Sequence, residues 1–593
     1  MKTTQALAVS MALGSLSCMA QSFDHLDANM VRARFTAHGM IGLDRSVGEP
    51  DFEVPIGSGA HALFAASLWV GGYDTLGGLH LAGLLFDQIG LPDYAPGPLT
   101  TDGSASITPA VAAQYDHVFK IKAVDVALHQ AYYDCLNTPG CDVNVQFPGY
   151  VIPQSFFDWP GNGDTLAGQA ARLAPFIDLD GDGLYEPTTG DAPCIHGDEA
   201  LYFMFNDVLN PHGTGGAPLG IEVHAMPFAF YSQDEALAHT LFIKYRLINR
   251  SDDPYEMVRI GLFTDYDLGY GRDDYVGSDP ERNLGYVYNA DTLDETTSSY
   301  TGYGSMPPAF GTTQLKGPYL EPDGFDDPEG PGIPAFNGSG FGDLVVDNER
   351  HGVSYMTYFS NDATARGNPN TAEQFFGYLS GYWRDGTPLF HGGTGHYSDP
   401  EATNVQARFA FPGFEDPLGA GTGGQVMGPW AEHSSGNQPW DRRMVMSVGP
   451  LDLDAGEEIE LVYALVFARP GSNGLMSSVL RLQERVDSVQ AIYSDLPEAC
   501  NGAGSQVGME ERTDRGPVLF PVPAEDRLTL RLEVPGPVEF VVYDMLGVEF
   551  LRGRDTRDLV EIDLSELDQG LYLFHVAQGE VSHVVPFVKV TTR

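Results

Sequence analysis

Alternating apolar and polar positions in the middle of the chain predict β-strands. The clearest run is LFIKYRLIN at residues 241–249, and VRIGLFT at 258–264 repeats its pattern. A period of two over runs of this length is typical of strands that bury one face. The apolar positions are Leu241, Ile243, Tyr245, Leu247, Val258, Ile260 and Leu262, and Lys244 and Arg246 lie on the opposite face.

Similar runs recur along most of the chain, whereas helical periodicity is rare. Strand-like runs occupy residues 52–99, 221–230, 353–359 and 459–468, and Trp69 in the first of them is expected in a core. Residues 475–493 instead place apolar side chains three and four apart, which predicts a helix capped by Ser472 or Asn473. The fold class is therefore mostly β, with a β-rich or β-sandwich body that has one helix near its C-terminal end.

The last part of the chain forms a separate pattern. Five short alternating runs follow residue 517 at turn-separated intervals, which predicts a small Ig-like β-sandwich. The preceding residues 501–516 are polar and rich in glycine, as expected of a linker. We therefore expect a β-rich extracellular region at 21–500, a linker at 501–516 and a domain at 517–593, and leave open a subdomain boundary near 160–175.

The first twenty residues predict a secretory signal peptide. Lys2 precedes the apolar run ALAVSMALGSL, and Cys18-Met19-Ala20 provides small residues for cleavage before Gln21. Ser15 stands where a lipoprotein signal needs a large aliphatic residue, so signal peptidase I is the expected enzyme. No later run approaches the roughly 18 apolar residues of a membrane helix.

The cysteines are expected to form disulfides, because their number after cleavage is even and the chain is exported. Cys135 and Cys141 enclose a Pro-Gly turn that suits a local bridge. Cys194 and Cys500 would be the remaining pair.

Composition supports the β class and restricts the partners. The chain has 70 Gly and 41 Pro, and its 42% hydrophobic content suffices for large cores. Its 81 acidic residues against 32 Lys and Arg give a net charge of −49. Nucleic acids and anionic membranes would be repelled by such a surface. Most of these acids are explained by solubility alone.

One acidic motif has the spacing of a calcium loop. The motif begins with DLDGDG at residue 178, where every second residue is an aspartate and a glycine allows the chain to turn. An EF-hand would need Glu at the twelfth position, where this chain has Thr189, so a short extracellular calcium loop is the expectation. A merely solvated cluster of Asx turns is the alternative. The candidate ligands are Asp178, Asp180, Asp182, Glu186 and Asp191.

A second acidic segment follows the paired strand patterns directly. Carboxylates this dense repel one another unless hydrogen bonds, water or a hard cation compensates them. We therefore regard this segment as a further calcium candidate. Its acids are Asp265, Asp267, Asp273, Asp274 and Asp279.

The C-terminal segment resembles the type A sorting domain of cargo for the bacterial type IX secretion system. The matching pieces are FPVPAEDRL at Phe520, YDMLG at Tyr543, LSELDQGLYLFHV at Leu564 and FVKV at Phe587. The chain departs from the usual Pro-Asn-Pro by reading Pro-Val-Pro at 521–523. The resemblance implies transit through the periplasm, the type IX machinery as partner, and a secreted or outer-surface destination.

The body also resembles a family of secreted proteins that bear this sorting domain. Pieces such as FEVPIGSGAHALFAASLWVGG, LGIEVHAMPFAF, GDLVVDNERHG and DRRMVMSVGPLDL carry the resemblance between about residues 50 and 450. That family has no established activity, so the resemblance implies destination and architecture only.

Two function classes remain open at this stage. The first is a calcium-stabilised protein with a binding, adhesive or structural role, whose partner could be a glycan or surface polymer. Its candidate aromatic platforms are Tyr382, Trp383, Trp430 and Trp440. The alternative is a secreted glycan- or peptide-degrading hydrolase, although HExxH, GxSxG and a cysteine nucleophile signature are missing from the sequence. No catalytic residue is predicted.

Overall fold

The computed structural model divides the chain into two compact units, residues 1–508 and 509–593. In the first unit, called the body, it describes residues 22–85, 92–328, 330, 338–472 and 474–496. In the second it describes 518–520, 527–531, 537–544, 549–557, 559–565, 567, 570–578 and 581–589. The predicted signal peptide, the linker and Cys500 lie outside the described residues. The pairing of Cys194 with Cys500 therefore stays a prediction.

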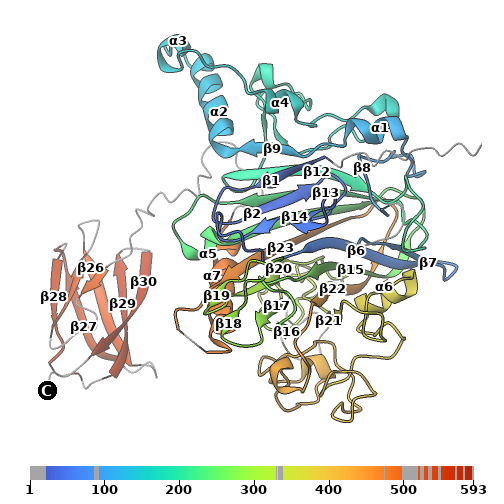
Figure 1. Ribbon diagram of the computed structural model, residues 1–593. Coiled ribbons are helices and arrows are strands. Elements are labelled where there is room, and N and C mark those ends of the chain that lie inside the picture. Colours follow the sequence, from blue (N-terminus) through green and yellow to red (C-terminus); the bar gives the residue numbers. More distant parts are fainter. Residues whose placement is uncertain are drawn as a thin grey trace, which may run out of the picture. The chain divides into compact units, whose positions relative to one another are not determined.

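The body is built on a nine-stranded sheet (Figure 1). All its strand pairs are antiparallel. In spatial order the strands are β16 (Asp274–Asp279), β17 (Leu284–Asn289), β20 (Ala309–Lys316), β23 (Glu458–Ala468), β14 (Thr240–Asn249), β13 (Ile221–Ala229), β12 (Glu199–Asn206) and β8 (Ala95–Pro96), while β9 (Phe119–Lys122) also pairs with β12.

Smaller sheets complete the body. The five-stranded sheet runs β21 (Tyr355–Ser360), β22 (Arg442–Leu453), β15 (Tyr255–Asp265), β6 (Ala65–Asp74) and β7 (Leu79–Ala82). A three-stranded sheet contains β1 (Phe23–Leu26), β2 (Arg32–Thr36) and β5 (Phe52–Glu53). The two-stranded pairs are β3 (Leu43–Asp44) with β4 (Glu49–Pro50), β10 (Phe176–Ile177) with β11 (Ala192–Pro193), and β18 (Leu293–Asp294) with β19 (Gly304–Ser305).

The two large sheets share one hydrophobic core. Leu241 and Tyr245 of β14 belong to the same buried cluster as Leu262 of β15 and Trp69 of β6. All seven apolar positions predicted on the inner faces of residues 241–249 and 258–264 are in this cluster. The predicted alternation and the mostly β fold are thus confirmed.

The opposite face of the nine-stranded sheet buries a second core beneath α7 (Ser477–Ser494). Val479, Leu482, Val486 and Val489 of this helix pack with strand residues such as Phe242 and Val466. The predicted helix is confirmed, but its predicted cap is wrong in part. Met476 occupies the cap position without a side-chain hydrogen bond. Ser472 instead accepts a hydrogen bond from Ser477 Oγ through its backbone carbonyl, and Asn473 lies outside the described residues.

A 15-residue helix that sequence periodicity did not predict is α2 (Ala123–Asn137). Its buried side chains include His129, Tyr133 and Cys135, so it lacks a plain aliphatic stripe. Cys135, in its last turn, forms the predicted disulfide with Cys141. The other helices are α1 (Pro109–Gln114), α3 (Val143–Gln146), α4 (Gln154–Asp158), α5 (Glu235–Ala238) and α6 (Ala372–Leu379). Among the helices of the described residues, none has both the length and the apolar character of a membrane span.

The second unit is a small β-sandwich, as predicted. One sheet contains β24 (Val518–Phe520), β25 (Arg527–Arg531) and β28 (Leu559–Asp563), and the other contains β27 (Glu549–Asp555), β26 (Val538–Asp544), β29 (Gly570–Gln578) and β30 (Val581–Lys589). Leu528 and Val560 of the first sheet share a core with Phe540 and Phe574 of the second.

Candidate functional site

The Asp178 loop brings three of its five predicted ligands together. The antiparallel pairing of β10 with β11 joins the two ends of the loop, which places Asp191 beside its beginning. Carboxylate oxygens of Asp178, Asp180 and Asp191 lie within 4.8 Å of one another. Asp182 and Glu186 are exposed and are not members of this group.

Backbone N–H groups shape this trio of carboxylates. Asp178 accepts hydrogen bonds from the amides of Gly181 and Gly183 at 2.8 and 3.0 Å. Asp191 accepts from the amides of Leu179 and Glu186 at 2.8 and 2.9 Å. These bonds hold the loop closed, with both glycines at positive φ.

Electrostatic repulsion is visible within the trio. The pKa of Asp191 is raised by burial and by the charges of Asp178 and Asp180, although its two amide hydrogen bonds act in the opposite direction. Arg172 offsets part of the repulsion through an ion pair of 2.9 Å with Asp178 Oδ2. A divalent cation would compensate all three carboxylates at once.

The second predicted group does not form a single set of ligands. Asp265 pairs with the buried guanidinium of Arg443 at 2.7 Å. Asp279 pairs with Arg282 at 2.8 Å and accepts a hydrogen bond from Gln483. Arginine therefore neutralises the first and last acids of this segment.

Two of the three remaining acids, Asp273 and Asp274, are influenced by the charge of a residue that the sequence did not single out, Asp294 of β18, and Asp274 is also influenced by Asp267. Asp274 is fully buried; its Oδ2 accepts a hydrogen bond from the Leu268 amide at 3.1 Å, and its Oδ1 has no hydrogen-bond partner. Asp273 Oδ1 is likewise buried without one. Side chains at Gly269 and Gly271 would collide with the carboxylates of Asp294 and Asp267 respectively, which explains both glycines. We call Asp267, Asp273, Asp274 and Asp294 the buried acid cluster.

Burial and mutual repulsion raise the pKa values of this cluster. Burial raises the pKa of Asp274 well above its usual range, and the charges of Asp273, Asp267 and Asp294 add to the effect. Burial and then Asp294 raise the pKa of Asp273 to about 8. Burial raises the pKa of Asp294 to about 6, against two backbone hydrogen bonds. Such groups must take up protons or a cation.

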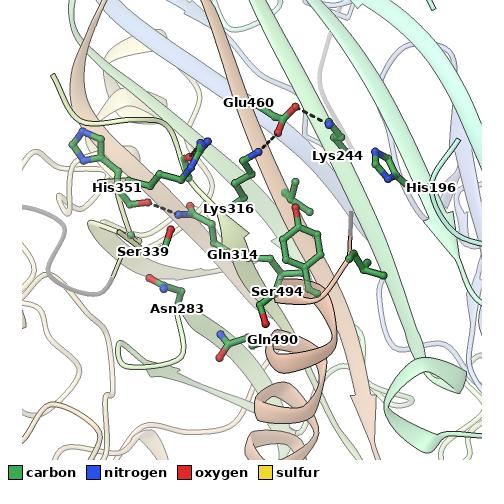
Figure 2. A pocket seen from close by; sticks show the side chains of 18 of the residues that line it. His196, Lys244, Asn283, Gln314, Lys316, Ser339, His351, Glu460, Gln490 and Ser494 are labelled. Carbon is green, nitrogen blue, oxygen red and sulfur yellow. Dashed lines mark hydrogen bonds and ion pairs between the residues drawn. The ribbon is translucent and has the colours of Figure 1, made fainter. Parts of the chain in front are cut away.

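A polar groove lies on the face of the nine-stranded sheet beyond the C-terminal end of α7 (Figure 2). One cavity of about 510 Å³ is lined by β14, β20 and β23 and by the last turn of α7. A second cavity of about 430 Å³ shares His196, Lys244 and Glu460 with the first. We call the two together the Glu460 groove.

Strand register explains the floor of this groove. Lys244 of β14 is opposite Val462 of β23, and Val462 is opposite Lys316 of β20. Arg246 is opposite Glu460 in the next row. Residues opposite one another in an antiparallel pair point to the same face, so the predicted polar face of residues 241–249 becomes the groove floor.

Glu460 is the centre of an ion-pair network. Its carboxylate oxygens accept from Lys244 Nζ at 2.7 Å and from Lys316 Nζ at 2.6 Å (Figure 2). Burial opposes ionisation, but the two ammonium groups hold the pKa of Glu460 below its usual range. The carboxylate therefore stays charged and orients both lysines.

Arg350 differs from the other cations of the groove in its burial and its partners. Its side chain is largely buried, with 9% of the residue exposed. It donates from Nη1 to the carbonyl of Gly317 at 2.9 Å and stacks on Tyr319, 3.5 Å from the ring centroid. No carboxylate of a described residue forms an ion pair with it. A buried guanidinium in this state is costly to desolvate.

Neutral hydrogen-bonding groups surround these charges. Burial lowers the pKa of His196 and of His351 to about 4, so both rings are neutral at pH 7. Gln314 donates to the His351 carbonyl at 2.9 Å, while its buried Oε1 has no hydrogen-bond partner. The groove thus offers both donors and acceptors.

Two of the predicted aromatic platforms are wrong. Trp383 and Trp430 are buried and donate their indole N–H groups to the carbonyls of Gly395 and Gly393. The surrounding glycine-rich loops fold over these rings instead of exposing them. Tyr382 and Trp440 are exposed, at 38% and 45%.

Comparison with known proteins establishes the class of the second unit. Residues 518–589 match the family described as secretion system C-terminal sorting domain. The chain is therefore cargo of the type IX secretion system, delivered to the outer cell surface or the exterior. The match confirms the sorting domain expected from sequence despite its Pro-Val-Pro departure.

The body has no comparable assignment. No curated protein matches the chain. A solved polysaccharide lyase aligns at 11% identity with a TM-score of 0.17, covering 65% of this chain and 36% of that one. A likeness at this score carries no argument for either fold or activity.

Proposed function

We propose that this exported protein is stabilised by Ca²⁺ and has a binding or adhesive role outside the cell. The observation that carries the calcium proposal is the convergence of the Asp178, Asp180 and Asp191 carboxylates within 4.8 Å. The donor set contains only oxygen, which suits a hard cation rather than a transition metal. Calcium tolerates irregular sites of six to eight oxygens, so backbone carbonyls and water would complete the shell.

The buried acid cluster is a second candidate for calcium, although no three of its described carboxylates converge within 4.8 Å as those of the Asp178 loop do. Asp274 is fully buried and has a carboxylate oxygen without a hydrogen-bond partner. Uncompensated charge in such a position is destabilising by several kcal/mol. A bound calcium ion would convert this cost into a stabilising contribution, in which Asp267, Asp273 and Asp294 are available as further ligands.

The Glu460 groove supports the binding role. Each of its two cavities, of about 510 and 430 Å³, lies within the range of small-molecule pockets, about 300–1,000 Å³. Their walls contain charged and neutral polar groups. These groups are held by β-strands, so they are positioned before any ligand arrives.

Thermal unfolding with calcium, magnesium or EDTA tests the calcium proposal. Calcium at about 100 times its dissociation constant should stabilise the body by about 2.7 kcal/mol per site. Asp180→Asn together with Asp191→Asn should remove the part of this response that the Asp178 loop provides. Asp362→Asn is the matched control, because Asp362 also accepts a backbone N–H two residues on, from Thr364, but belongs to neither acidic group.

Two results would contradict the calcium proposal. If magnesium or matched ionic strength reproduces the effect of calcium, the acids form solvated turns rather than a calcium site. The loop assignment also fails if the double variant responds to calcium as the wild type does.

A further inference from the structure

The Glu460 groove gathers five cationic side chains in a strongly anionic protein. The whole chain has 81 acidic residues against 32 Lys and Arg, yet the two cavities are lined by five cationic side chains and two acidic ones. The cations are Arg172, Lys244, Arg246, Lys316 and Arg350, and the acids are Glu281 and Glu460. Carboxylates already pair with four of these cations: Glu460 with Lys244 and Lys316, Glu458 with Arg246, and Asp178 with Arg172. The attraction of the groove for an anion therefore centres on Arg350.

We propose that this groove binds a uronic-acid-containing oligosaccharide, with a sugar carboxylate at Arg350. The inference rests on the binding role proposed above and names its ligand class. Arg350 is largely buried, stacks on Tyr319 and has no ion pair with a described residue. A ligand carboxylate would compensate this guanidinium through charge-assisted hydrogen bonds, which are stronger than neutral ones.

The neutral groups of the groove favour a sugar over other anions. Gln314 Oε1 is a buried acceptor that lacks a donor, and the rings of His196 and His351 are neutral at pH 7. Hydroxyl groups both donate and accept, so a sugar ring can satisfy an amide oxygen and a neutral imidazole together. A fully ionised inorganic anion such as sulfate has no such donor for Gln314.

The dimensions of the groove favour more than one sugar unit. The two cavities, of about 510 and 430 Å³, adjoin at His196, Lys244 and Glu460. Phe228 and Tyr493 line the first cavity and add apolar surface for the C–H faces of sugar rings. We therefore expect an oligosaccharide of several units.

Isothermal titration calorimetry on the intact protein in calcium-containing buffer provides the test. The probes are tetragalacturonate, the neutral cellotetraose, tetraglutamate and inorganic phosphate. We expect binding of tetragalacturonate that weakens as salt is added, and at least tenfold weaker binding of the other three. Arg350→Gln should weaken tetragalacturonate binding roughly 10- to 100-fold, as expected for loss of a charged hydrogen bond.

Two further variants keep the result interpretable. Lys244→Gln removes a second groove cation at a less buried position and should also weaken binding. Arg408→Gln removes the same charge from an exposed arginine that lines neither cavity, and should leave binding unchanged. Circular dichroism and the unfolding midpoint show that each variant is folded.

Several outcomes would overturn the inference. Equal affinity for cellotetraose, tetraglutamate or phosphate would refute the uronic-acid class while leaving a binding role in place. Unchanged affinity in folded Arg350→Gln and Lys244→Gln would move the site elsewhere on the protein. Absence of binding by all four probes at millimolar concentration would reject the uronic-acid ligand, and failure on a broad glycan and peptide array would count against the binding role itself.

Discussion

In the absence of calcium, the stability of the body should fall as the pH rises. The change in pH acts on the buried acid cluster, because its carboxylates have raised pKa values in the folded protein. In the unfolded chain these groups lose their protons near pH 4. Between pH 4 and the folded pKa, the folded state therefore binds more protons than the unfolded state, and each rise in pH favours unfolding.

The pKa of Asp294 gives the size of the expected loss of stability. Burial raises its pKa from 3.8 to about 6. A shift of about two pKa units corresponds to about 3 kcal/mol of stability lost between pH 4 and pH 7, before solvent screening reduces it. The pKa of about 8 for Asp273 extends the loss toward pH 8, although that side chain is partly exposed and counts for less. Under the calcium proposal, the ion should oppose the whole loss, because it would bind the ionised carboxylates.

Urea unfolding followed by tryptophan fluorescence measures this effect in the body alone. All five tryptophans belong to the body, namely Trp69, Trp159, Trp383, Trp430 and Trp440. Curves at pH 5 and pH 8, with calcium or EDTA, give the four free energies that are needed.

Asp274→Asn is the decisive variant. The asparagine keeps an oxygen that can accept a hydrogen bond from the Leu268 amide, while one negative charge is removed. It should narrow the pH 5 to pH 8 difference in EDTA and reduce the gain from calcium. If the wild type in EDTA is as stable at pH 8 as at pH 5, the reasoning is refuted.

Four other predictions follow from the sequence and the architecture. Deleting residues 518–589, the matched sorting domain, should leave the protein in the periplasm, as cell fractionation would show; surface delivery of the truncated protein would contradict this. Mass spectrometry should find the exported N-terminus at Gln21. Cys135→Ser should cost about 2–3 kcal/mol in the chain-entropy picture, and peptide mapping with both thiols reduced in exported wild type would exclude the bridge. Arg443→Met should destabilise the body by about 3–5 kcal/mol, because it leaves the buried Asp265 without its ion pair; equilibrium unfolding checks this, and a loss below about 1 kcal/mol would show that solvent reaches Asp265.

Local periodicity was sufficient for the central strands and for α7. Leu241, Tyr245 and Leu262 alternate with polar residues because each strand buries one face in a shared core. Val479, Val486 and Val489 of α7 lie on one face because the helix covers a sheet. In both cases one strand or helix packs one face against one surface. The spacing of apolar residues within that element is therefore enough to predict it.

Groups assembled from distant segments could not be predicted in this way. Asp294 reaches the buried acid cluster from β18, and Arg350 reaches the Glu460 groove from the loop before β21. Neither residue lies at a recognisable spacing from its neighbours in the site. Only the strand register between Lys244, Val462 and Lys316 places the groove floor. Conversely, the glycines that flank Trp383 and Trp430 indicate turns but do not indicate what folds over the two rings.

The placement of β23 has a consequence for biogenesis. This strand lies between β20 and β14, yet it begins at Glu458, more than 200 residues after β14 begins at Thr240. A nascent or truncated chain that ends before β23 would present two unpaired interior edges, and such edges invite aggregation. Pairing over so long a separation is also slow to form. The body can therefore close its central sheet only after Ala468 has been made, about four-fifths of the way along the chain, which makes termination before that point particularly harmful.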